Sequence, residues 1–170
     1  MDAFLENVET IGKAVGEVDK AVELVNQIKT EIQTIQANIP EHAEKPSVLV
    51  LSEVGPGTGP FMMGPGNISY DLIKLAGAEP AVDKIDLESS TPASIEQILK
   101  MNPDYILLLD FVGDGDKVFT DLMKSPGWDN VEAVKNEQTM VLAAKYLMNP
   151  NVENVEGLDK LVRFIYKLEE

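Results

Sequence analysis

Cysteine is absent from the 170 residues of this chain, and histidine and tryptophan each occur only once. Without cysteine the chain cannot form a disulfide, a thiolate nucleophile or a zinc site of the cysteine type. The single histidine, His42, cannot build a multi-histidine metal site. It lies between Pro40 and Pro46, in a segment whose composition predicts a solvated linker.

Basic residues are also scarce, because 14 Lys and Arg, with Arg163 the single arginine, face 29 acidic residues and leave a net charge of -15. Nucleic acids and anionic membrane surfaces attract clustered Lys and Arg, so the charge argues against both partners. No apolar run reaches the roughly 20 residues that cross a membrane. No signal-peptide pattern follows Met1, so we expect any signal peptide to lie outside this sequence.

The first 46 residues have a helical pattern. Apolar residues recur at helical spacing at Phe4, Val8, Ile11 and Val15, and again at Val18, Ala21, Val25, Ile28, Ile32, Ile35 and Ile39. The second series alternates steps of three and four, which predicts one long amphipathic helix that ends at Pro40. We favour a helix that lies along a globular body. A coiled-coil seam between two copies of the chain is the alternative.

From residue 47 onward, short apolar runs alternate with helical stretches. The expected strands are Val48–Leu51, Tyr105–Leu109 and Thr139–Leu142, with a further short strand near Val82–Ile85. The expected helices are Ile68–Ala76, Ala93–Met101, Lys117–Lys124 and Val152–Leu168. This alternation predicts parallel strands joined by crossover helices, and hence a three-layer α/β/α sandwich with a mostly parallel sheet. Runs that are apolar on both faces fit a sheet covered on both sides.

In such a sheet, ligands bind beyond the carboxyl ends of the strands. The loop after the first strand, Gly55–Gly66, has eight Gly or Pro among its twelve residues and carries Phe61, Met62 and Met63. Soft, polarizable methionines favour an apolar ligand that contains a metal. The alternative is that Phe61 and one methionine fill the core under the loop. The loop lacks the Lys-Ser/Thr of a P-loop, which disfavours a nucleotide.

The loop after the second strand, Asp110–Asp116, is rich in Asp and Gly. Asp114, Gly115 and Asp116 faintly resemble a calcium loop, but no glutamate follows at the required position. We therefore predict that Asp116 caps the next helix. Phe111 and its neighbour Val112 are candidates for lining a cleft.

The loop after the third strand, 143–150, contains Lys145, Tyr146 and Met148. Tyr146 is a candidate to ligate ferric iron or to hydrogen-bond a ligand, and its alternative role is a half-buried aromatic over the last helix. The sequence contains no Gly-x-Ser-x-Gly motif and no carboxylate pair with an obvious partner base. We therefore predict a protein that is not an enzyme and has no intrinsic cofactor. The alternative is a flavodoxin-like enzyme domain that binds a nucleotide or phosphate.

Three motifs follow one another at a distinctive spacing: Ile68–Gly77 (ISYDLIKLAG), Thr91–Ile106 (TPASIEQILKMNPDYI) and Pro126–Asn136 (PGWDNVEAVKN). In order and spacing they resemble the C-terminal lobe of the iron-complex class of ABC-transporter substrate-binding proteins. That class includes the receptors for siderophores, haem and cobalamin. The resemblance spans residues 2–166 and implies a helical-backbone (class III) receptor, in which one long helix joins two lobes that hold the ligand between them.

The resemblance implies two parts, a helical segment 1–46 that includes the interlobe helix and a C-terminal lobe 47–170, with the N-terminal lobe missing. It implies an extracytoplasmic location, periplasmic or as a lipoprotein on the cell surface, and an ABC permease as partner. Glu96 matches the acidic residue that docks on permease arginines, and a solvated helix face is its alternative role. With one lobe missing, the exposed N-terminal helix is also a candidate interface for a homodimer.

By position, the resemblance makes six residues the ligand-binding set: Phe61, Met62, Met63, Phe111, Tyr146 and Met148. Receptors for catecholate siderophores line their cleft with Arg and Lys, but the candidate loops here offer only Lys117 and Lys145. An apolar cleft with methionines favours haem over another iron complex and over cobalamin. Met62 or Met63 would then supply a thioether to the haem iron.

Overall fold

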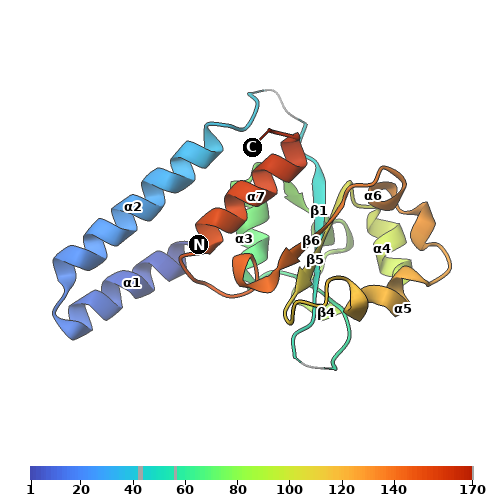
Figure 1. Cartoon of the computed structure of the whole chain (residues 1–170), viewed down its shortest axis with the longest axis horizontal. Coiled ribbons are helices and arrows are strands. Elements are labelled where there is room, and N and C mark those ends of the chain that lie inside the picture. The colour runs from blue at the N-terminus through green and yellow to red at the C-terminus, as the bar shows by residue number, and fades with distance from the viewer. Residues whose placement is uncertain (42–43, 56, 170) are drawn as a thin grey trace.

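The computed structural model describes residues 1–41, 44–55 and 57–169, and Figure 1 shows the arrangement of their elements. The α-helices are α1 (Asp2–Val15), α2 (Val18–Gln36), α3 (Ile68–Leu75), α4 (Ile95–Met101), α5 (Thr120–Met123), α6 (Glu132–Lys135) and α7 (Asn154–Tyr166). The strands are β1 (Ser47–Ser52), β2 (Phe61–Met62), β3 (Glu79–Pro80), β4 (Thr91–Pro92), β5 (Tyr105–Asp110) and β6 (Thr139–Ala143). Short 3₁₀-helices are η1 (Ala81–Ile85), η2 (Lys117–Phe119), η3 (Trp128–Asn130) and η4 (Ala144–Tyr146).

The strands form one mixed sheet in the order β4-β2-β1-β5-β6. The three strands β1, β5 and β6 are parallel, with Leu49 of β1 opposite Ile106 of β5. One edge of β1 is shared by two short strands. β3 runs parallel to its first residues, and β2 returns antiparallel beside its last residues, with Ser52 opposite Phe61. The three main predicted strands are therefore confirmed, and β2 and β4 add an antiparallel edge.

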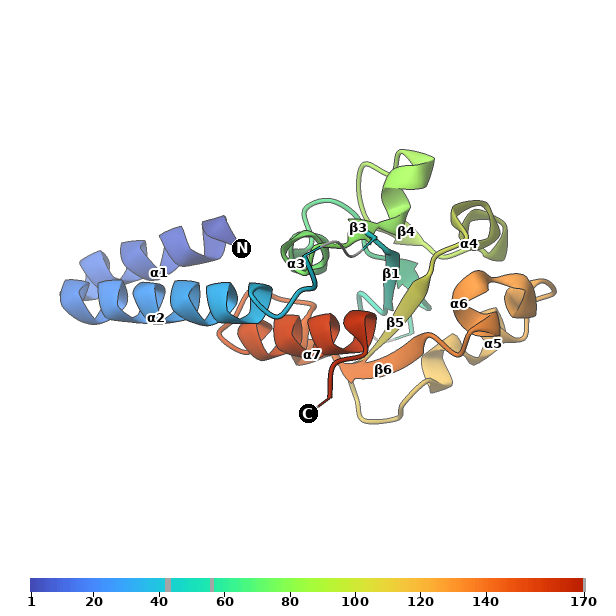
Figure 2. The same cartoon turned by 90° about the horizontal axis from the view of Figure 1, so that it is seen from above.

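Helices cover both faces of the sheet, as Figure 2 shows. On one face, Val50 and Leu107 pack in a cluster with buried residues of α2, α3 and α7. On the other face, Leu49 and Ile106 pack with α4 and with the segment from η2 to α6. All residues of β1 are buried, because neighbours along the strand alternate between the two clusters. This is the predicted three-layer α/β/α sandwich.

The two N-terminal helices form a hairpin that projects from the sandwich (Figures 1 and 2). Gly16 ends α1 in the left-handed conformation, with φ 76°, which a glycine adopts without strain. The two helices approach closely near this turn, since a Cβ built on Gly12 would stand 2.3 Å from the Cβ of Ala21. The chain thus reverses direction between Val15 and Val18, and the predicted long helix is α2 alone.

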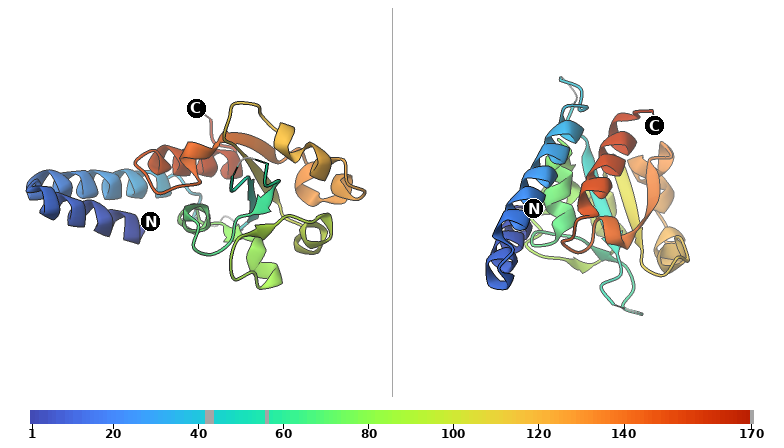
Figure 3. Two further views of the ribbon diagram at one scale, coloured as in Figure 1. Left: turned by 90° about the horizontal axis from the view of Figure 1, so that it is seen from below. Right: turned by 60° about the vertical axis from the view of Figure 1, so that its left-hand side comes forward.

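Most of the predicted apolar series on α2 is buried: Ala21, Val25, Ile28, Ile32 and Ile35. These residues face other helices of the same chain, because α2 contacts α1 over one part and α7 over another, and Figure 3 shows α2 running beside α7. This favours an amphipathic helix that packs on its own chain. Towards the turn the hairpin still exposes a second group of apolar residues: Ile11, Val15, Val18 and Val22.

The strand expected near Val82–Ile85 is wrong, because these residues belong to η1. Val82 is buried without a strand partner. The side chain of Lys84 turns inward, and its Nζ donates to the Ser47 Oγ and the Met101 carbonyl oxygen, each at 3.0 Å. Asp86 then takes a left-handed conformation, with φ 54°, and ends the turn.

Several predicted helices differ in extent from those observed. The long helix α2 ends at Gln36 and not at Pro40, and α3 and α7 are slightly shorter than predicted. The segment 117–124 divides into η2 and α5, which together cover Lys117–Met123. The helix expected from Ala93 begins at Ile95, because the Ser94 Oγ accepts the amide of Gln97 at 3.3 Å and caps the first turn. The last helix, α7, lies within the predicted range. The prediction for His42 concerns a residue outside the described part of the chain.

Candidate ligand-binding site

The loops that follow β1, β5 and β6 meet at one edge of the sheet, because these three strands are parallel. The loops after β1 and β5 enclose a hollow of about 340 Å³. The residues that line this hollow, called here the Phe111 hollow, are Glu53, Val54, Gly55, Phe111 and Val112. Phe111 is 49% exposed and Val112 is 71% exposed, so two apolar side chains stand open to a ligand at the position where this class of sheet binds one.

The conformation of the second loop depends on Asp110, the last residue of β5. Its Oδ1 accepts the backbone amides of Val112 at 3.0 Å, Gly113 at 2.8 Å and Asp114 at 3.3 Å. Its Oδ2 accepts the amide of Gly115 at 2.9 Å. These hydrogen bonds, above all the one from the Gly115 amide, hold the pKa of the Asp110 carboxyl below its usual value.

Asp116 occupies the N-cap position of η2, as predicted, and its carbonyl oxygen accepts the amide of Phe119 at 2.9 Å. The Asp116 side chain, however, makes no capping hydrogen bond there. Asp110 accepts the loop amides instead, since it stands at the strand end, where the backbone begins to turn around its carboxylate. In the same loop, the Lys117 Nζ pairs with the Asp114 carboxylate at 2.9 Å.

The first loop closes on itself through short-range hydrogen bonds. The Thr58 Oγ1 donates to the carbonyl oxygen of Gly55 at 2.8 Å, and the Glu53 Oε1 accepts the amide of Gly57 at 3.2 Å. Gly57 and Gly59 both have positive φ, at 75° and 73°, which explains why glycine recurs here. The loop therefore forms a defined wall of the Phe111 hollow.

The three residues that the sequence placed on this loop lie deeper than expected. Met62 and Met63 have exposed fractions of 0% and 2%, with Met62 in the cluster on the α4 face and Met63 in the cluster on the α7 face. Phe61 is half-buried and packs on the α7-face cluster. All three are drawn inward because β2 pairs with β1 and joins the sheet. Their positions favour the alternative in which such residues fill the core, and neither methionine lines the Phe111 hollow.

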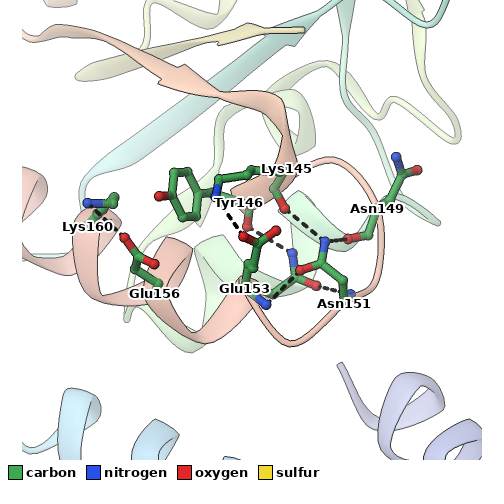
Figure 4. Close-up of polar contacts among 8 residues, drawn as sticks. Lys145, Tyr146, Asn149, Asn151, Glu153, Glu156 and Lys160 are labelled. Atoms are coloured by element: carbon green, nitrogen blue, oxygen red, sulfur yellow. Dashed lines mark hydrogen bonds and ion pairs between the residues drawn. The ribbon is translucent and has the colours of Figure 1, made fainter.

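The third loop holds Tyr146 between two lysines (Figure 4). The Lys145 Nζ lies 4.7 Å and the Lys160 Nζ 5.3 Å from the centre of the Tyr146 ring. Each lysine also pairs with a carboxylate of the last helix region, Lys145 with Glu153 at 2.6 Å and Lys160 with Glu156 at 3.2 Å. The hydrogen bond to Glu153 raises the pKa of Lys145. The half-buried phenol ring thus lies in a network of paired charges.

Buried polar contacts position this third loop on α7. Asn154 is fully buried, its Nδ2 donates to the Tyr146 carbonyl oxygen at 2.9 Å, and its Oδ1 accepts the Asn151 amide at 2.8 Å. Met148 is half-buried, and its carbonyl oxygen accepts the Asn67 Nδ2 at 3.3 Å. The loop is therefore joined to α7 on one side and to the start of α3 on the other.

Two larger grooves, of about 530 and 640 Å³, lie along α7. Their acidic residues from the α7 region already have basic partners: Glu153 with Lys145, Glu156 with Lys160 and Asp159 with Arg163. The Phe111 hollow differs from these grooves because its lining is mostly apolar: among the described residues that line it, Glu53 is the one charged group. The Phe111 hollow also lies at the carboxyl ends of β1 and β5, and we therefore regard it as the candidate ligand-binding site.

Glu96 is exposed in the first turn of α4 and does not line the Phe111 hollow. Within the described part of the chain, no group of three or more His, Asp or Glu side chains could hold a metal ion. No helix among the same residues is long and apolar enough to span a membrane.

The sequence predictions included Phe111 and Val112 but missed Glu53, Val54 and Asp110. Their positions at the ends of the first two strands were the available signal.

The comparisons with known proteins agree on one protein family. Residues 1–146 match the family described as periplasmic binding proteins. An uncharacterized ABC transporter substrate-binding lipoprotein of Bacillus subtilis, YvrC, is 26% identical over 161 residues, which are 95% of this chain and 49% of that protein. The Fe(3+)-citrate-binding protein YfmC of the same organism is 27% identical over 139 residues, 81% of this chain and 41% of that protein. The chain thus spans about half the length, or less, of these curated relatives.

Solved structures with the same fold cover almost the whole chain. The IsdE protein of S. aureus, crystallised with haem, superposes with a TM-score of 0.83 at 24% identity, covering 95% of this chain and 63% of that one. The periplasmic haem-binding protein RhuT of Roseiflexus sp. RS-1 gives a TM-score of 0.82 at 22% identity, covering 96% and 62%. A possible iron-binding solute-binding protein of Staphylococcus epidermidis also gives 0.82, at 25% identity, covering 97% and 62%.

Proposed function

The chain belongs to the periplasmic binding protein family, and we propose that it is one ligand-binding lobe, with its interlobe helix, of an ABC-importer substrate-binding protein. In this proposal residues 1–46 contain the interlobe helix and residues 47–170 form the lobe. The protein binds its cargo outside the cytoplasm, as a periplasmic protein or a surface lipoprotein, and does not catalyse a reaction of that cargo. Support comes from the family match and from the substrate-binding lipoprotein among its relatives, of which the chain spans about half.

The cargo in this proposal is an iron complex, with haem favoured over a siderophore. The single observation that carries it is the chemistry of the Phe111 hollow, where exposed Phe111, Val112 and Val54 surround the space. A flat macrocycle with a large apolar face gains from contact with such side chains. A polyanionic chelate such as ferric citrate would instead meet Glu53, and the nearest cation of the second loop, Lys117, is already paired.

A haemin titration followed by visible absorption tests this proposal. We expect a Soret shift with the wild type, and a weaker affinity for Phe111→Ala and Val112→Ala. Val152→Ala is the matched control, because Val152 is an equally apolar, exposed residue that lines the groove between α2 and α7. A titration in which Val152→Ala weakens binding and Val112→Ala does not would move the site to that groove. Competition by ferric citrate, but not by apolar porphyrins, would overturn the preference for haem.

The partner in this proposal is an ABC permease, with Glu96 as one docking carboxylate. Glu96 is exposed at the start of a helix that does not contribute to the Phe111 hollow, so a permease could reach it while the hollow holds cargo. Such a carboxylate would supply orientation and association rate more than affinity. Glu96→Gln should therefore leave haemin binding and thermal stability unchanged and reduce only the coupling to transport.

We further propose that the exposed side of the α1–α2 hairpin is covered by another surface, either the second lobe of the receptor or a second copy of this chain. Ile11 and Val15 are 61% and 66% exposed, and Val18 and Val22 lie beside them across the turn. Exposed apolar groups of this kind mark interfaces. Light scattering at tens of micromolar distinguishes the two: the isolated chain should dimerise if a second copy covers the hairpin, and a clean monomer would reject the homodimer.

A further inference from the structure

Asp110 lies at the end of β5, directly before the exposed apolar residues Phe111 and Val112. The four residues that follow Phe111 point their amides at its carboxylate, at 3.0, 2.8, 3.3 and 2.9 Å. A carboxylate oxygen accepts several such bonds at once, and charge-assisted bonds of this kind are about twice as strong as neutral ones. One side chain therefore takes up every backbone donor from Val112 to Gly115.

The core formed by the described residues does not include the two apolar side chains at the start of this loop. Phe111 and Val112 are 49% and 71% exposed, and neither belongs to the two clusters that form the core. Gly113 and Gly115 have positive φ, at 81° and 72°, so the backbone curls around the carboxylate in a conformation that lacks support from burial. An exposed aromatic on an unsupported loop would normally sample many positions or collapse onto the surface.

From these contacts we infer that Asp110 is a positioning residue, which holds Phe111 and Val112 outward so that they meet the ligand already ordered. This inference rests on the proposed function of the Phe111 hollow. Its physical basis is preorganisation: ordering a loop before binding removes an entropic penalty that would otherwise weaken the affinity. Asp110 itself faces the loop amides and does not line the Phe111 hollow.

The chain offers a graded set of variants for the test. Asp110→Ala removes all four hydrogen bonds. Asp110→Asn retains one carbonyl oxygen, which can accept the amides of Val112, Gly113 and Asp114, but it sets an NH₂ group against the amide of Gly115. Asp116→Asn is the matched control, because it removes one negative charge from the same loop, and the Asp116 side chain makes no capping hydrogen bond.

Two measurements separate this inference from the proposed function. Amide hydrogen exchange of residues 112–115, measured without ligand, should show protection in the wild type and in Asp116→Asn, partial loss in Asp110→Asn and full loss in Asp110→Ala. Haemin affinity should follow the same order and fall about tenfold or more in Asp110→Ala, since one factor of ten corresponds to about 1.4 kcal/mol. Thermal stability should stay that of the wild type in Asp116→Asn and fall in Asp110→Ala, which loses the four hydrogen bonds, while the two core clusters stay intact.

Each result has one meaning for the inference. Retained protection in Asp110→Ala would overturn it, and so would lost protection with unchanged haemin affinity. If the wild type does not bind haemin at all, haem is rejected as cargo, and the order of the loop alone then decides the inference. Lost protection in Asp110→Ala, together with averaged NMR signals of the Phe111 ring and the Val112 methyls, would support the inference. A single ordered set of these signals in Asp110→Ala would overturn it.

Discussion

Gly157 of α7 packs directly against the backbone of Tyr146, so closely that a Cβ built on Gly157 would stand 2.3 Å from the Tyr146 carbonyl oxygen and 2.9 Å from its carbonyl carbon. The same oxygen accepts the buried Asn154 Nδ2. A helix and the third loop therefore meet backbone to backbone at this point. Any side chain on Gly157 would separate them.

Gly157→Ala should consequently destabilise the fold. Relief requires a movement of backbone, and overpacking of this kind costs about 1–3 kcal/mol, which exceeds the helix propensity of at most ~1 kcal/mol that alanine gains. For a chain of this size we expect a fall in Tm of several degrees, measured by thermal unfolding. Gly55→Ala is the matched control, since its nearest neighbour is a Thr58 methyl at 3.5 Å. Equal stability of the two variants would contradict the close contact.

Replacement of the buried methionines by leucine separates a core role from an iron-ligand role. Met62→Leu and Met63→Leu conserve volume and should each cost less than about 1.5 kcal/mol, whereas the corresponding alanine variants should cost about 2–5 kcal/mol. If the side chains only fill the core, the haemin spectrum of the leucine variants matches that of the wild type. A changed spectrum in Met62→Leu or Met63→Leu, at unchanged stability, would restore the thioether ligand that the sequence suggested.

Asn67 makes two separable contributions, and two variants distinguish them. Its Oδ1 accepts the Ser69 amide at 2.9 Å and caps α3, while its Nδ2 donates to the Met148 carbonyl oxygen. Asn67→Ala loses both and should cost about 1–2 kcal/mol in chemical denaturation. Asn67→Asp keeps the cap, so it should cost clearly less and alter the amide resonances of residues 147–149. Equal losses for the two variants would mean that the cap contributes nothing.

The loop held by Asp110 should resist acid. Hydrogen bonds from the amides of Gly115, Gly113 and Val112 lower the pKa of this carboxyl in the folded chain below its value of about 4 in the unfolded chain. A lowered pKa means that the stabilising contribution is fully present above about pH 4 and is lost as the pH falls through the lowered value. The Gly115 amide resonance, followed while the fold stays intact, should therefore titrate below pH 4. A midpoint near pH 5 would contradict the hydrogen bonds.

The sequence alone predicted the strands that are apolar on both faces. Tyr105–Leu109 and Val48–Leu51 form strands because no exposed helix or loop tolerates such runs, and the structure extends each of them by only one or two residues. The alternation with helices then determined the three layers. The local sequence pattern was therefore sufficient to predict a strand wherever the run of residues is buried on both faces of the sheet.

The same reasoning failed where a distant partner decides the outcome. Phe61 and Met62 follow a run of Gly and Pro that resembles an open loop, yet they pair with the free edge of β1 and are drawn inward. Likewise, the loop after β5 contains several aspartates, and the one that accepts the loop amides depends on where β5 ends. Neither fact is contained in the spacing of the residues.

The pairing of β2 with β1 determines where insertions and deletions in this chain would be tolerated. Because Ser52 and Phe61 are fixed opposite each other, the intervening segment begins and ends at neighbouring positions of the sheet, whatever its length. Insertions or deletions between them would leave the register of the sheet intact, and loop length carries only a slowly growing entropic cost. We expect other members of the family to differ first in the length and composition of this segment, while the register between β1 and β2 is kept.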